Sequence, residues 1–146
     1  MNVIRASLND LPKLVPLFDA YRQFYKQASN LTACEAFLAS RMSQQESCIF
    51  LALEAEQAIG FTQLYPSFSS VRMRRLWVLN DLFVHPDLRR KGVGRALLER
   101  AAEWGHETEA AALMLETGID NLPAQTLYEQ LGWTRNDDYY VYYLSV

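Results

Sequence analysis

A basic turn with two glycines, residues 89–95, carries the residue types in this chain that are best suited to binding chemistry. It reads Arg-Arg-Lys-Gly-Val-Gly-Arg and follows an apolar run that ends at His85. A helical pattern begins at Val93, and the first turn of a helix has N–H groups without intrahelical partners. Gly92 and Gly94 would let an oxyanion approach those N–H groups, where the helix dipole favours negative charge. The spacing therefore fits either a phosphate-binding turn or a turn whose glycines serve only backbone conformation and packing.

Two common phosphate loops do not fit this turn. The nucleoside-triphosphate loop needs Gly-Lys-Ser/Thr, which the chain lacks, and the dinucleotide fingerprint needs a third glycine where Leu97 stands. The observed pattern is Arg89-x-x-Gly92-x-Gly94 after a strand that ends in Val-x-Pro. It resembles the acyl-CoA pyrophosphate loop of the GNAT superfamily of N-acetyltransferases.

A second segment, residues 121–133, resembles the other signature of the same superfamily. It has an Asn before a helix, a Leu-Tyr pair on one face, and a Gly-Trp pair at its end. Both signatures stand in the superfamily's order, with one strand pattern between them. The resemblance covers nearly the whole chain, and the middle third is further similar to a branch that includes yeast histone and polyamine acetyltransferases.

The resemblance implies which residues contact acetyl-CoA, the acyl donor. They belong to the end of the strand before the turn, to the turn itself, and to the helix that Asn121 caps. The implied residues are Leu82, Phe83, Val84, Arg89, Arg90, Lys91, Gly92, Val93, Gly94, Arg95, Asn121, Ala124 and Tyr128. In matched members the position of Tyr128 donates a proton to the leaving thiolate, whereas a lone tyrosine on such a helix is otherwise a core residue.

A polar pair, Asn80-Asp81, interrupts the apolar strand before the turn. An unsatisfied buried polar group costs roughly 1–3 kcal/mol, which a local bulge or a function would explain. The pair either bonds the backbone where the sheet splays or supplies Asp81 as a general base or anchor for an amine. Glu116, at the end of the strand pattern 112–117, has the same two interpretations. The catalytic candidates are therefore Tyr128, Asp81 and Glu116, and no metal site is expected.

Together these features predict an N-acetyltransferase that moves an acetyl group from acetyl-CoA to a primary amine. The acceptor would be a polyamine, an amino compound or a protein lysine, attacking directly in a ternary complex. An alkylammonium with a pKa near 10.4 must first lose a proton, and main-chain N–H groups near Phe83 and Val84 would hold the oxyanion. No cysteine or serine stands in a nucleophile setting. The alternative is a non-catalytic acyl-CoA-binding module that uses the same cleft.

The elements that must position these residues mix strands and helices. Strands are predicted at 3–5, 48–54, 58–65, 74–84, 111–117, 133–135 and 140–144, with a Ser- and Pro-rich loop at 66–70. Helices are predicted after Asn9 or Asp10, from Thr32, from the basic turn to about Thr108, and over 122–131. Antiparallel strands followed by βαβα predict an α/β (α+β) fold. The resemblance implies a mixed, mostly antiparallel, splayed sheet flanked by helices on both faces, with the donor in the split.

Length and composition indicate one domain over residues 1–146. Half of the residues are apolar and the formal net charge is −3, which disfavours a nucleic-acid partner. The sequence shows no signal peptide or membrane span, so a cytoplasmic protein is expected. Cys34 and Cys48 lack metal spacing and are interpreted as reduced thiols. The expected partners are a small-molecule amine or a basic peptide, and a homodimer is left open.

Overall fold

The computed structural model describes residues 1–89 and 91–146. Arg90, one of the residues predicted to contact the donor, lies outside them. The chain divides into two compact units, Met1–Leu115 and Glu116–Val146, which are described in turn.

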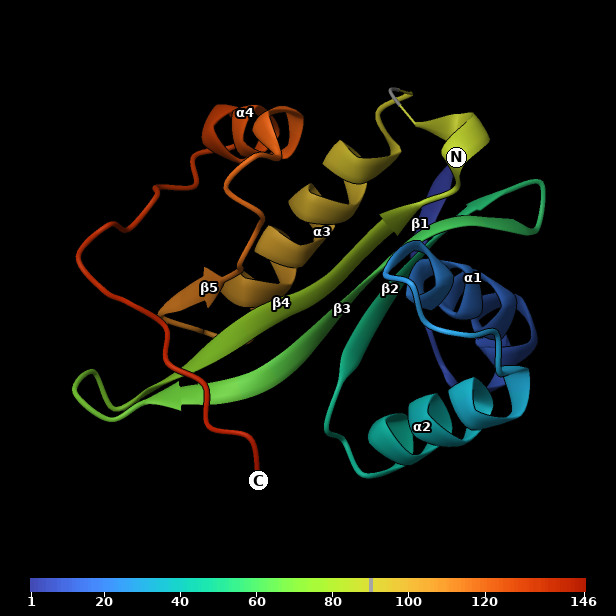
Figure 1. Ribbon diagram of the computed structural model, residues 1–146, viewed down its shortest axis with the longest axis horizontal. Helices are drawn as coiled ribbons and strands as arrows, with labels where there is room; N and C mark the ends of the chain where they lie inside the picture. Colours follow the sequence, from blue (N-terminus) through green and yellow to red (C-terminus); the bar gives the residue numbers. More distant parts are fainter. Residues whose placement is uncertain (90) are drawn as a thin grey trace. The chain divides into compact units, whose positions relative to one another are not determined.

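The first unit is built on a sheet whose strand order, within its described residues, is β1-β2-β3-β4-β5 (Figure 1). The strands are β1 (Asn2–Arg5), β2 (Cys48–Glu54), β3 (Gln57–Ser69), β4 (Arg74–Val84) and β5 (Ala112–Met114). The helices are α1 (Leu11–Phe24), α2 (Leu31–Ser43) and α3 (Val93–Glu107), with 3-10 turns η1 (Leu8–Asp10) and η2 (Pro86–Leu88). Strands β1 to β4 pair antiparallel and β5 joins β4 in parallel, which confirms the predicted mixed, mostly antiparallel sheet.

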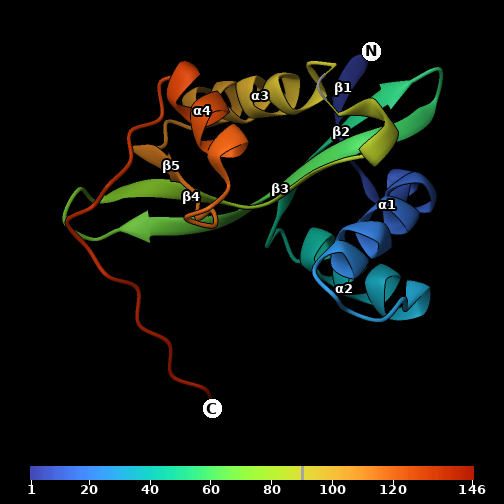
Figure 2. The ribbon, with the colours of Figure 1, turned by 45° about the horizontal axis from the view of Figure 1, so that its top comes forward.

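Helices cover both faces of this sheet (Figure 2). Helices α1 and α2 pack against each other on one face of the sheet, with α1 on β3, whereas α3 packs on β2, β3 and β4 from the opposite face. Each contact follows from the apolar stripe of a helix at helical spacing. On α1 the buried apolar residues are Leu11, Leu14, Val15, Leu17 and Phe18, and on α3 they include Val93, Leu97, Leu98 and Ala101. Because both faces are covered, β2 is buried continuously from Cys48 to Leu53.

Strand β4 is longer than its parallel neighbour. Strand β5 pairs only with Leu76, Trp77 and Val78. Beyond Val78 the outer edge of β4 has no strand partner among the described residues of the first unit, whereas its inner edge stays paired to β3 as far as Val84. The sheet therefore opens along the second half of β4, as the family resemblance implies.

The predicted loop at 66–70 is wrong, because β3 continues through Pro66 to Ser69 and pairs with β4. The Ile59 carbonyl accepts from His85 N–H (2.8 Å), so odd-numbered residues of β3 bond to β4. Even-numbered residues, including Pro66, then face β2. Strand β2 begins opposite Leu64, so the missing N–H of the proline costs no ladder hydrogen bond.

The second unit contains α4 (Leu122–Gln130) and a long C-terminal segment. The strands predicted at 133–135 and 140–144 are wrong, since residues 133–146 contain no strand. A strand needs a neighbour to take its N–H and C=O groups, and no described residue pairs with this segment. The strand predicted to reach Thr117 also ends earlier, at Met114, which leaves Glu116 outside it.

Candidate active site

A β-bulge at Asn80 orients the centre of β4. In the register with β3, Gln63 stands opposite Asp81 while Leu64 stands opposite Leu79, so Asn80 is an extra residue. The bulge that the polar pair suggested is therefore present. Side chains two residues apart on a strand normally share a face of the sheet. The extra residue therefore moves the side chains after the bulge to the opposite face from the one that the alternation before it predicts.

Ring contacts show this reversal. Trp77, before the bulge, packs against Trp104 of α3 with ring centroids 5.8 Å apart. Phe83, after it, packs against Tyr21 of α1, also at 5.8 Å. Asp81 shares the face of Phe83 and so points toward α1, away from α3.

The Asp81 carboxylate is buried, with 4% of the residue exposed, and is held by donors. Gln63 Nε2 donates to Oδ2 at 2.6 Å and Asn80 Nδ2 donates to Oδ1 at 3.0 Å. The Tyr21 hydroxyl also bonds to this carboxylate, and burial together with the Asp81 charge raises the pKa of Tyr21 above its usual value. Burial, then Asp81, likewise raises the pKa of Tyr65 to about 12. Both phenols therefore stay protonated beside the carboxylate at neutral pH.

The side-chain oxygen of Gln63 is a further acceptor at this point. Gln63 is fully buried, and its Oε1 has no hydrogen-bond partner among the described residues. A buried acceptor without a donor is costly, by roughly 1–3 kcal/mol. Gln63 does not line the cavity described below, so its role here is to hold the Asp81 carboxylate.

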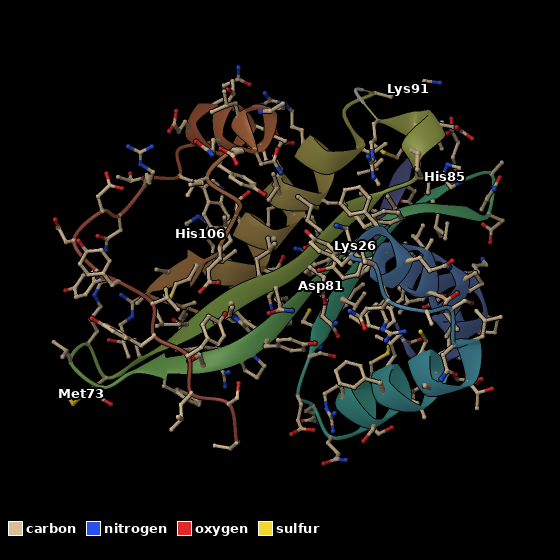
Figure 3. The ribbon with its side chains drawn as sticks, in the orientation of Figure 1. Lys26, Met73, Asp81, His85, Lys91 and His106 are labelled. Carbon is tan, nitrogen blue, oxygen red and sulfur yellow. The ribbon has the colours of Figure 1, made fainter. Side chains whose placement is uncertain are left out.

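Asp81 lines a cavity of about 480 Å³ between α1, α2, β3 and β4. The volume is typical of small-molecule sites. The walls are formed by Phe18, Tyr21, Arg22, Ala33, Cys34, Phe37, Tyr65, Asn80 and Asp81. Figure 3 places Asp81 near the middle of the sheet.

A second buried carboxylate, Asp19 of α1, fixes the wall of this cavity. It accepts from Asn30 N–H (2.8 Å), Ser29 Oγ (2.7 Å) and Gln23 Nε2 (3.0 Å), which ties α1 to the start of α2. The Asn30 and Ser29 hydrogen bonds lower the pKa of Asp19 below its usual value. Sequence reasoning missed this residue, although an Asp four positions after Val15 lies on the apolar face of the predicted helix.

Beyond Asp81, main-chain groups of β4 line the open edge of the sheet. Because His85 N–H bonds to β3, alternation places the N–H groups of Leu82 and Val84 on the outer edge and that of Phe83 in the ladder. The side chain of Arg89 closes the end of this edge. Its Nε donates to the Val84 carbonyl at 3.2 Å, and its guanidinium lies over the rings of Phe24 and Phe83.

The basic turn leads into the N-terminus of α3 as predicted. Gly92 is the N-cap with φ 80°, and the first intrahelical bond runs from Ala96 N–H to Gly92 O at 3.0 Å. The amides before Ala96 thus point out of the helix end, where the dipole is positive. A Cβ at Gly92 would meet nothing within 4 Å. The first amides of α3 are groups of the kind that bind a diphosphate.

The cations of the turn differ in their surroundings. Arg95 lies 3.8 Å from Glu99 on the surface of α3. Lys91 is exposed and points outward beyond the end of β4 (Figure 3).

The second unit carries the other predicted residues. Asn121 caps α4 as expected, its Oδ1 accepting from Ala124 N–H at 3.3 Å. Tyr128 lies on α4 with its ring 6.1 Å from that of Trp133. Glu116 is exposed. The first unit thus brings together Asp81, the edge of β4 and the basic turn, and the second brings together Asn121, Ala124 and Tyr128.

Neither cysteine is placed as a nucleophile. Cys34 and Cys48 are 2% and 3% exposed, and burial raises the pKa of both thiols, that of Cys48 to about 11. A thiol reacts through its thiolate, so both are inert at neutral pH. Within the described residues no group of His, Cys, Asp and Glu side chains could hold a metal ion. None of the described helices is long and apolar enough to cross a membrane.

Comparison with known proteins extends these observations. A model of the acetyltransferase (GNAT) family matches residues 13–133. The uncharacterized N-acetyltransferase YhfO of Bacillus subtilis is 46% identical over 100% of this chain and 98% of its own length. A probable acetyltransferase of Haemophilus influenzae is 39% identical over 80% of each chain.

Solved structures agree with the sequence matches. The crystal structure of a probable acetyltransferase superposes with a TM-score of 0.94 at 39% identity, covering 100% of this chain and 98% of that one. An aminoglycoside N-acetyltransferase in complex with CoA shares the fold, with a TM-score of 0.81 at 18% identity over 99% and 95% of the two chains. Given the basic turn, the opened sheet and these matches, the chain belongs to the acetyltransferase (GNAT) family and is an acyl-CoA-dependent N-acetyltransferase that takes its acetyl group from acetyl-CoA.

Proposed function

We propose that the acceptor is a primary amine that binds in the cavity against Asp81 and attacks the thioester directly. The observation that carries this proposal is the bulge at Asn80. It turns a buried carboxylate into a cavity of ligand size, on the strand whose open edge leads to the basic turn. The acceptor nitrogen and the acyl donor would therefore meet along one strand.

Asp81 would take the proton that the amine must lose. An alkylammonium has a pKa near 10.4 and is not nucleophilic until deprotonated. Asp81 would accept this proton directly or through a water molecule, while Gln63 and Asn80 hold the carboxylate in place. Positioned general bases typically contribute about 100- to 10,000-fold. Glu116 is the competing candidate, but its exposure and its position outside β5 favour Asp81.

Main-chain amides would hold the charge that develops on the thioester oxygen. The N–H groups of Leu82 and Val84 face the open edge of β4 and are suited to a tetrahedral oxyanion. The amides at the start of α3 would bind the diphosphate of the donor, with Arg89, Lys91 and Arg95 adding positive charge. Arg89 already contacts Val84 O, so it would act at the junction of the two regions.

Tyr128 would give a proton to the departing thiolate, as the family resemblance implies. Direct transfer fits the two inert thiols, because an acyl-enzyme would need an activated nucleophile. Polyamines and histone tails, the acceptors of the branch to which the middle third is similar, remain predictions at this level.

The proposal is tested by Asp81→Asn with Glu116→Gln as the matched control. Asp81→Asn keeps the shape of the side chain and one acceptor oxygen but removes the basic carboxylate. The value of kcat should therefore fall at least about 100-fold with little change in acetyl-CoA affinity. Glu116→Gln should stay within about twofold of the parent. The measurement is CoA thiol release across a panel of amines. Full activity of Asp81→Asn, or loss in Glu116→Gln alone, would contradict the assignment of the base.

A further inference from the structure

We infer that the cavity selects a primary monoamine with a flat, apolar body, such as an arylalkylamine, in preference to a polyamine or a basic peptide. This inference rests on the proposed function, since it names the class of acceptor for the same site. It follows from the charges and the rings that line the cavity.

The charges allow one ammonium. Asp81 is the one carboxylate among the described lining residues, and Arg22 faces the same space. Arg22 donates to Ala28 O at 3.3 Å, and its charge adds to the hydrogen bonds that lower the pKa of Asp19. Asp19 lies nearby but is 4% exposed, and both of its oxygens already accept hydrogen bonds from Asn30, Ser29 and Gln23. A second ammonium would therefore find a guanidinium where it needs a carboxylate.

The surroundings add a further cation. Arg41 of α2 lies over the ring of Phe37, 5.1 Å from its centroid, and is paired with Glu46 at 3.0 Å. Its charge also acts on Tyr65 of the cavity wall. Because Glu46 offsets the charge of Arg41, the repulsion of a second ammonium comes mainly from Arg22 of the cavity wall.

The rings provide the complementary surface. Phe18 and Phe37 are stacked, with centroids 6.1 Å apart and an interplanar angle of 1°. Tyr21 and Tyr65 face the cavity from α1 and β3, next to Asp81. Aromatic walls favour a flat apolar body through stacking and edge contacts. An amine with such a body would bury it between the helices while its nitrogen reaches the carboxylate.

The test compares binding and turnover of four amines by the full chain loaded with CoA or acetyl-CoA: 2-phenylethylamine, spermidine, a lysine-containing basic peptide, and phenylalanine. Calorimetry should show 2-phenylethylamine binding at least about tenfold more tightly than the other three. Equal or tighter binding of spermidine or the peptide would overturn the inference. Tighter binding of phenylalanine would also overturn it, because it would make Arg22 a carboxylate site. Turnover tests the proposed function separately. Binding of 2-phenylethylamine without thiol release would refute the proposed function and leave the inferred selectivity standing.

Two variants and a matched control sharpen the result. Phe37→Ala removes a ring that is 40% exposed, so the fold should persist while the affinity for 2-phenylethylamine falls about tenfold. Phe68→Ala, on a ring that is 69% exposed and not part of the cavity wall, is the matched control and should change nothing. Arg22→Gln should raise the affinity for spermidine. No change in Phe37→Ala, or an equal change in Phe68→Ala, would contradict the assignment of the aromatic wall.

Discussion

Asp81 can remain buried in the middle of a sheet because donors surround its carboxylate. Gln63, Asn80 and Tyr21 each offer one hydrogen bond, so the charge is compensated within the fold. The same donors fix its direction into the cavity. Gln63, like Asp19, is a residue that sequence reasoning did not single out, although a polar residue inside the apolar run of β3 was a visible signal.

Tyr128 offers a second test at the level of single residues. If it donates the proton to the leaving thiolate, Tyr128→Phe should lower kcat about 100-fold while the affinity for acetyl-CoA is nearly unchanged. Tyr140→Phe, on a tyrosine that is 91% exposed, should have no effect. The measurements are thiol release and calorimetric titration with CoA. Parallel losses of kcat, CoA affinity and melting temperature would make Tyr128 a packing residue.

At the level of elements, β4 and α3 form a single functional unit joined by the basic turn. The strand presents Asp81 on one face and its amides along the open edge, and the helix presents its first amides after Gly92. Gly60 on β3 permits this arrangement, since a Cβ there would lie 3.0 Å from Phe83 O and 3.1 Å from Val93 Cγ1. The start of α3 therefore sits directly on the strand pair.

Gly92 gives the element-level prediction. Its φ of 80° is left-handed, and an L-residue pays roughly 1–2 kcal/mol in that region. Gly92→Ala should therefore lower the free energy of unfolding by about 1 kcal/mol and weaken CoA binding at least about tenfold, because the new methyl enters the space before the helix amides. Gly118→Ala is the matched control, since its Cβ also meets nothing and its φ is not left-handed. Denaturant unfolding and calorimetry measure both effects, and unchanged CoA binding in Gly92→Ala would argue against the diphosphate site.

At the scale of the molecule, the first unit has apolar layers on both sides of one sheet, and its two thiols lie inside them. We expect Cys48, which does not line the cavity, not to react with a disulfide reagent at about pH 8 in the native protein, and both thiols to react once guanidinium unfolds it. The raised pKa of Cys48 also makes stability depend on pH. The buried neutral thiol contributes fully to the free energy of unfolding below about pH 9, and this contribution is lost as the pH rises through about 11. Cys48→Ala should remove that part of the pH dependence. Rapid labelling of native protein would show that the layers open.

The sequence by itself determined the elements with strong local signals. Strands β2 and β4 and helix α3 lie where periodicity and the glycine turn predict them, because alternation, apolar runs and helix caps act over a few neighbouring residues. The two superfamily signatures likewise identified the acyl donor. The Ser- and Pro-rich stretch at 66–70 was wrongly predicted to be a loop, because its strand conformation comes from pairing with β4 and not from its own residues.

Tertiary structure alone decided which way the polar pair faces and what surrounds it. Asn80 and Asp81 are adjacent in the chain, and only the register with β3 shows that one is the extra residue of a bulge and the other points toward α1. The cavity likewise forms only where helices and strands from separate parts of the first unit meet, and Asp19 holds α1 to the start of α2 there. The strands predicted near the C-terminus did not form because pairing is a contact between distant segments, and the alternation of a segment cannot supply its neighbour.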